Sequence, residues 1–127
     1  MGRALALAVC CLAAVFWWHN FVSSGRCLAQ LDAHPHRRGT ATALFYFARY
    51  YEIFNKNDVA LEHYKRIVER YPRSRYGMEA QYGVAASYEK MKRFHDAIVE
   101  YEKFLEDYPD NKYTVSVRNN VEILKSR

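Results

Sequence analysis

The sequence of 127 residues contains no cysteine after Cys27, and its other two cysteines, Cys10 and Cys11, also lie near the N-terminus. This absence excludes a structural disulfide and a cysteine nucleophile from the rest of the chain. The chain has only five glycines and no glycine-rich phosphate-binding loop, and no serine, histidine and aspartate form a recognisable catalytic motif. The sequence therefore predicts a protein that is not an enzyme and needs no cofactor.

Histidine is also sparse. His34 and His36 have no cluster of cysteine or acidic ligands around them, so we expect a surface linker there and no metal site. His63 and His95 are isolated, and we expect each to lie at the surface or at a groove edge.

An excess of charge of one sign is missing from the body of the chain. From Ala41 to Arg127 there are 15 Lys and Arg against 13 Asp and Glu, a net charge of +2 within an overall +5. The basic cluster between Lys65 and Arg75 is interrupted by Glu69, which favours a solvated helix end over a phosphate site. No nucleic-acid partner is expected.

Charge is absent altogether from the apolar run Ala4–Trp18, which follows the basic Arg3. This pattern, with small residues near Gly25 and Ala29, predicts a cleaved signal peptide over residues 1–27. A retained membrane anchor stays open as the alternative. The uninterrupted run has 15 residues and extends to 19 at Val22, close to the length of about 20 that a spanning helix needs.

Cys27 is the candidate for lipid attachment, by analogy with bacterial lipoproteins. Such a site requires a small residue directly before the cysteine, and Arg26 stands there, so an unmodified cysteine is the alternative. Residues 28–40 contain Pro35, Gly39 and a polar run, and are predicted to form a linker.

In place of catalytic motifs, the chain contains one sequence segment that occurs twice in similar form. Residues 60–76 read ALEHYKRIVERYPRSRY and residues 97–113 read AIVEYEKFLEDYPDNKY, at a spacing of 37. All eleven tyrosines lie between Tyr46 and Tyr113. A period of about 20–50 residues indicates a solenoid whose units bury their apolar faces by stacking on one another.

Apolar residues follow a helical period from Thr42 onward, interrupted by polar turns at residues 55–58 and 90–94 and by Pro72 and Pro109. The sequence predicts an all-α domain over 41–127, with helix pairs at 41–74 and 78–111 and a capping helix at 113–126. The residues expected on the apolar faces are Ala43, Leu44, Phe47, Ala48 and Tyr51; Ala60, Tyr64, Ile67, Val68 and Tyr71; Ala80, Val84, Ala85 and Tyr88; Ala97, Ile98, Tyr101, Phe104, Leu105 and Tyr108; and Val117, Val121 and Leu124.

These positions closely resemble the tetratricopeptide repeat over residues 41–127. The matching pairs are Ala48 and Ala85, Tyr51 and Tyr88, Ala60 and Ala97, Tyr64 and Tyr101, and Pro72 and Pro109. The family usually has a tryptophan in its first helix, where this chain has Leu44 and Gln81, and a period of about 34. The resemblance implies a short right-handed α-solenoid that acts as a protein-binding scaffold.

The ending Tyr-Pro followed by a polar stretch and Tyr, at 71–76 and 108–113, is similar to BamD-type and CpoB-type envelope proteins of bacteria. That resemblance implies an exported, periplasmic scaffold in outer-membrane protein assembly or a Tol-Pal-like system. The alternative is a membrane-anchored accessory subunit that packs permanently into a larger envelope complex.

In the solenoid that the resemblance implies, the first helix of each unit lines the inner face. The candidate partner-binding residues are therefore Phe45, Arg49, Glu52, Tyr82, Ala86 and Glu89, extended by Asn119 and Ile123 in the last helix. A wet groove without a partner is the alternative. The first helix lacks a preceding unit, so Phe45, Tyr46 and Tyr50 would face water, and self-association or docking is expected there.

Overall fold

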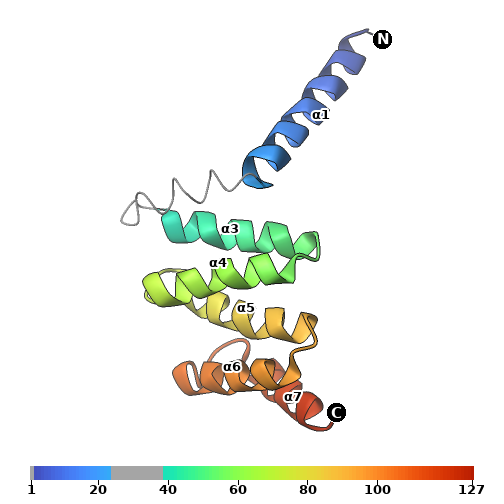
Figure 1. The fold of residues 1–127 in the computed structure, drawn as a ribbon. Helices are drawn as coiled ribbons and strands as arrows, with labels where there is room; N and C mark the ends of the chain where they lie inside the picture. Colours follow the sequence, from blue (N-terminus) through green and yellow to red (C-terminus); the bar gives the residue numbers. More distant parts are fainter. Residues whose placement is uncertain (1, 24–38) are drawn as a thin grey trace. The chain divides into compact units, whose positions relative to one another are not determined.

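The computed structural model describes residues 2–23 and 39–127 (Figure 1). Its contacts divide the chain into two compact parts, residues 1–40 and residues 41–127. Cys27 and most of the predicted linker lie outside the described residues.

Helix α1 spans Gly2–Ser23 and carries no acidic residue in its first turn and no basic residue in its last. Several large apolar residues between Val9 and Trp18 are exposed to solvent, among them Phe16 (73%) and Trp17 (67%). Trp17 stacks on Phe21, with ring centroids 5.5 Å apart. Across the described ranges, 2–23 and 39–127, no helix is long and apolar enough to cross a membrane.

The second part consists of consecutive antiparallel helices that pack each on the next (Figure 1). They are α3 (Thr40–Ile53), α4 (Asn57–Arg70), α5 (Gly77–Lys90), α6 (Phe94–Asp107) and α7 (Thr114–Lys125). Corresponding helices begin 37 residues apart, and no strand occurs in the described part of the chain. The predicted all-α fold of two helix pairs and a C-terminal helix is confirmed.

The turn inside each pair has the same form. Asn55 and Lys92 both adopt left-handed backbone conformations, with φ of 56° and 60°. The turns are closed by the amides of Lys56 and Arg93, which donate to the carbonyl oxygens of Tyr51 and Tyr88 at 3.0 and 2.9 Å. These turns are shorter than predicted, since they span residues 54–56 and 91–93. Asn57, the first residue of α4, is buried, and its side-chain amide donates to Oδ1 of Asn55 at 3.0 Å.

The core forms where small and aromatic residues alternate. Ala48, Ala60, Ala85 and Ala97 are completely buried, so that helix axes approach closely and large rings fill the space between them. Among the predicted apolar faces, most residues are buried. Ala43, Phe47, Val68, Tyr71, Ile98, Leu105 and Tyr108 are only half-buried, because they lie at the edges of their stripes.

Gly83 of α5 shows how closely the two pairs approach. A Cβ atom there would lie 2.8 Å from the ring of Tyr64 in α4. The absence of a side chain therefore lets the Tyr64 ring, which is only 2% exposed, lie directly against α5.

The expectation that His63 lies at the surface is wrong. His63 is 1% exposed and packs between the rings of Phe47 and Tyr51, at centroid distances of 6.2 and 5.5 Å. It occupies a position on the inward face of α4, one turn after Ala60, and so belongs to the core that joins α3 to α4. His95 is exposed as expected.

Candidate partner-binding site

A tyrosine–glutamate hydrogen bond recurs in both helix pairs. The hydroxyl of Tyr64 in α4 donates to Oε2 of Glu52 in α3 at 2.9 Å, and the hydroxyl of Tyr101 in α6 donates to Oε2 of Glu89 in α5 at 2.8 Å. Burial and the adjacent carboxylate raise the pKa of both tyrosines well above the ordinary value. Each pair of helices therefore contains a neutral tyrosine whose hydroxyl holds a carboxylate in place.

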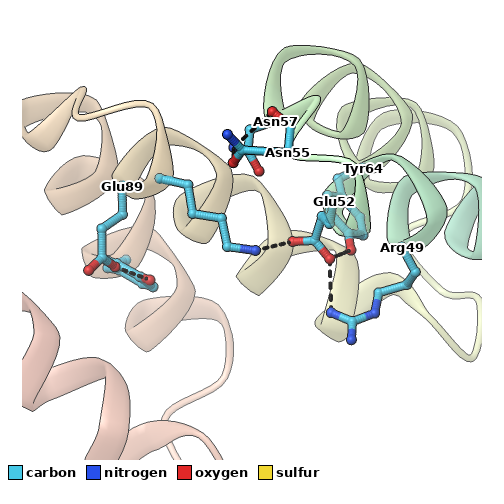
Figure 2. A network of polar contacts seen from close by, with 8 residues as sticks. Arg49, Glu52, Asn55, Asn57, Tyr64 and Glu89 are labelled. Carbon is cyan, nitrogen blue, oxygen red and sulfur yellow. Dashed lines mark hydrogen bonds and ion pairs between the residues drawn. The ribbon is translucent and has the colours of Figure 1, made fainter.

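In the first pair this carboxylate is surrounded by cations (Figure 2). Nη1 of Arg49 lies 2.8 Å from Oε2 of Glu52, and Nζ of Lys90 lies 3.0 Å from Oε1. The side chain of Glu52 is only 7% exposed. Partial burial lowers the pKa of Arg49, but Glu52 and Tyr64 together raise it, so the net change is upward.

In the second pair the equivalent carboxylate faces a pocket of about 480 Å³. Ala86 stands at the position of Arg49, so this position offers no charged side chain to Glu89. The pocket is lined by Tyr82, Ala86, Glu89, Lys90, Lys92, Phe94, Tyr101, Asn120 and Arg127. Its volume falls in the range of about 300–1,000 Å³ that is usual for ligand pockets.

A pair of stacked rings recurs in both helix pairs. Phe45 stacks on Tyr76 with centroids 4.3 Å apart and planes at 14°, and Tyr82 stacks on Tyr113 at 4.8 Å and 13°. The last tyrosine of each Tyr-Pro motif therefore packs on a ring of the first helix of its own unit. Burial and the charge of Glu89 raise the pKa of Tyr82, which keeps that ring neutral.

The structure places the predicted binding residues in two separate groups, and two further residues belong to neither group. Phe45, Arg49 and Glu52 are largely occupied with contacts inside the chain, whereas Tyr82, Ala86 and Glu89 line the pocket. Asn119 and Ile123 are exposed on α7 and do not line it. The candidate lipidation site, Cys27, lies outside the described residues.

Sequence reasoning missed the six other residues that line the pocket: Lys90, Lys92, Phe94, Tyr101, Asn120 and Arg127. Asn120 has a signal in the repeat, because it is the counterpart of Gly83 at the spacing of 37 and so faces the tyrosine of the preceding helix. Phe94 follows a turn and carries no periodic signal. In the described part of the chain, no group of three or more His, Cys, Asp or Glu side chains is placed to hold a metal ion.

The stacked helix pairs and their spacing of 37 residues define the class: a helical-repeat protein that presents side chains on stacked helices. The family model described as tetratricopeptide repeat matches residues 42–74 and 79–111, more than half of the chain. The chain belongs to the tetratricopeptide-repeat family. No curated protein sequence matches the chain.

Members of this family are generally non-catalytic scaffolds that mediate protein–protein interactions. The expectation of a protein-binding helical repeat agrees with this assignment.

Proposed function

We propose that this chain is a protein-binding scaffold that uses the pocket between α5, α6 and α7 to hold a partner. The observation that carries the proposal is the contrast between two equivalent carboxylates. Glu52 is enclosed by the chain's own cations, whereas Glu89 faces a pocket that also offers the ring of Tyr82 and the side chain of Asn120. A mixture of aromatic surface and a few placed polar groups is typical of binding sites.

We further propose that the protein works in the bacterial cell envelope, exposed to the periplasm. Two features support this location: the apolar helix α1 that follows a basic residue, and the Tyr-Pro motifs that resemble BamD-type and CpoB-type proteins. The corresponding partners are components of outer-membrane protein assembly or of a Tol-Pal-like system.

Site-specific photo-cross-linking of the full chain tests the binding role in the cells that produce it. A photoreactive residue at Ile123, exposed on α7 one helical turn after the pocket residue Asn120, should give discrete cross-linked proteins that mass spectrometry identifies. The same residue at Lys103, exposed on α6, is the matched control and should give few. Equal patterns from both positions, or none from either, would remove the proposed binding role. The N-terminal peptide in the same spectra reports whether residues 1–27 are cleaved.

An obligate accessory subunit is the second candidate, and exposed apolar side chains on α3 and in the turn after it favour it. Tyr46 is 62% exposed, Ile53 79% and Phe54 54%. Of the residues expected to face water there, Tyr46 does, while Phe45 and Tyr50 are half-buried. A variant that lacks residues 1–28 separates the two roles. An adaptor remains folded and monodisperse alone, while an obligate subunit aggregates until its partner is added.

A further inference from the structure

The two helix pairs differ most in how the chain neutralises the carboxylate at the end of the first helix. Glu52 receives three donors: the hydroxyl of Tyr64, the guanidinium of Arg49 and the ammonium of Lys90. Glu89 receives the hydroxyl of Tyr101, and within residues 39–127 no ion pair reaches it (Figure 2). The repeat thus contains one complete and one incomplete version of the same cluster.

The missing donors can be traced through the spacing of 37. The counterpart of Arg49 is Ala86, whose methyl group carries no charge and lines the pocket. The counterpart of Lys90 is Arg127, whose guanidinium carbon lies 5.5 Å above the ring centroid of Phe94. Lys90 lines the pocket as well, but its ammonium is held by Glu52 of the first pair.

We propose that the pocket beside Glu89 binds the guanidinium of an arginine side chain from a partner protein. The inference rests on the scaffold role proposed above and names the chemistry of the group that the scaffold recognises. Within this chain, Arg49 shows the mode of binding: its guanidinium lies on a carboxylate that a buried tyrosine holds in place. In the second pair the partner's arginine takes the place that Ala86 leaves open.

Three features of the pocket suit this group. The carboxylate of Glu89 is oriented by Tyr101, so little ordering is required when it accepts a charge-assisted hydrogen bond. The half-buried ring of Tyr82 lies beside it and offers a face to a cation. The side chain of Asn120 adds an amide oxygen that accepts from an N–H group.

The other charges at the pocket restrict which arginine fits. Lys92 and Arg127 line its rim and oppose a run of positive charge. They would instead attract acidic residues on either side of the bound arginine. An anion alone is disfavoured in the pocket, because it would approach the carboxylate of Glu89. We therefore expect a single arginine with acidic neighbours.

The test uses the full chain and a blocked peptide, acetyl-Gly-Asp-Arg-Asp-Gly-amide, followed by amide chemical shifts in NMR titrations. Binding should shift the amides of Ala86, Glu89 and Asn120. The same peptide with citrulline, which keeps the shape of arginine but not its charge, should bind at least tenfold more weakly. Equal affinity for the two peptides would overturn the proposal.

Two variants locate the binding on Glu89. Glu89→Gln keeps an acceptor for Tyr101 and removes the charge, and it should weaken peptide binding at least tenfold. Glu106→Gln makes the same change of charge at an exposed position on α6 and should leave binding unchanged. If both variants weaken binding equally, the peptide responds to net charge and the pocket is not an arginine site.

Ala86→Arg is a second test that does not depend on removing a group. It restores the arrangement of the first pair, so the chain's own guanidinium occupies the pocket and peptide binding should be lost. Retained binding in this variant would contradict the proposal. If no peptide binds the unaltered chain while cross-linking from Ile123 still captures a partner, the arginine site is wrong and the scaffold role stands.

Discussion

The two helix pairs have the same core and different surroundings for the carboxylate at the end of their first helix. Tyr64 and Tyr101 are buried alike, and the stacked rings beside them have nearly the same geometry. The residues that differ at the spacing of 37 are the ones that decide charge and access, Arg49 against Ala86 above all. The repeat thus keeps the packing positions constant, while the positions off the core stripe determine what each unit presents to a partner.

Among the changes that test this comparison, alkaline pH should have the largest effect on stability, because it ionises the buried tyrosine in each helix pair. A tyrosine is neutral when protonated, and folding raises the pKa of Tyr64 and Tyr101 above the ordinary value of about 10. Their contribution to stability is therefore complete below about pH 10 and is lost as the pH rises above it. Each should lower the free energy of unfolding by about 1.4 kcal/mol per pH unit there.

Circular dichroism and tyrosine absorbance between pH 8 and 13 measure this loss. We expect a cooperative unfolding transition in which the last tyrosines ionise together with the loss of helix. Tyr64→Phe and Tyr101→Phe should each remove about one tyrosine's share of the slope. Ionisation of all the tyrosines before any loss of helix would contradict the expected protection.

Gly77→Ala should cause the next largest effect, since it tests a difference in the connections between helices. A Cβ atom at Gly77 would overlap the backbone carbonyl of Pro72, which cannot move aside as a side chain would. We expect a loss of about 2–3 kcal/mol in the free energy of unfolding, measured by urea denaturation.

The counterpart position in the second connection provides the control. Thr114 carries a side chain there, and its Oγ1 donates to the carbonyl oxygen of Pro109 at 3.1 Å and accepts from the amide of Asn111 at 3.0 Å. Thr114→Ala should cost about 1 kcal/mol through these hydrogen bonds. Equal losses in the two variants would mean that the two connections have the same backbone shape.

The sequence was sufficient to predict the helices, because the apolar period, the repeated segment and Pro72 and Pro109 all indicate the same helix boundaries. Burial of Tyr64, Tyr101 and Phe104 follows from their places on the stripes. His63 was misjudged because its polar character outweighed its position on the inward face of α4. Periodicity places a residue on a face of its helix, but whether an imidazole there is buried depends on the rings that the neighbouring helix supplies.

The contacts of the candidate site were harder to predict because they join residues far apart in the chain. Lys90 reaches Glu52 across 38 positions, and Tyr76 stacks on Phe45 across the whole first unit. Neither contact follows from the pattern within one helix. The groove candidates were chosen as one surface, and the structure separates them into a cluster in the first unit and a pocket in the second.

Glu52→Gln should sharpen the comparison with a smaller effect on stability. It leaves an acceptor for Tyr64 but removes the charge that Arg49 and Lys90 share, so two cations remain close together without a counter-charge. Both cations are largely exposed, which limits the loss to about 1 kcal/mol. Glu89→Gln should change the free energy of unfolding by less than about 0.5 kcal/mol, since no ion pair within residues 39–127 depends on that carboxylate. If urea denaturation shows that the two substitutions lower the free energy of unfolding equally, the additional ion pairs of Glu52 do not contribute to stability.

Ala86→Arg should have the smallest effect and an opposite sign. The new guanidinium lies one helical turn before Glu89, the spacing at which Arg49 meets Glu52, and such pairs contribute about 0.2–0.5 kcal/mol on a helix surface. The variant should therefore be slightly more stable than the unaltered chain at low salt, and the gain should disappear at about 1 M salt because exposed charges are screened. Arg49→Ala makes the reverse change in the first unit and should show a loss of similar size with the same dependence on salt. A destabilised Ala86→Arg variant would mean that Lys92 and Arg127 repel the added charge more strongly than Glu89 attracts it, and the second unit would then be unable to accept an arginine from any source.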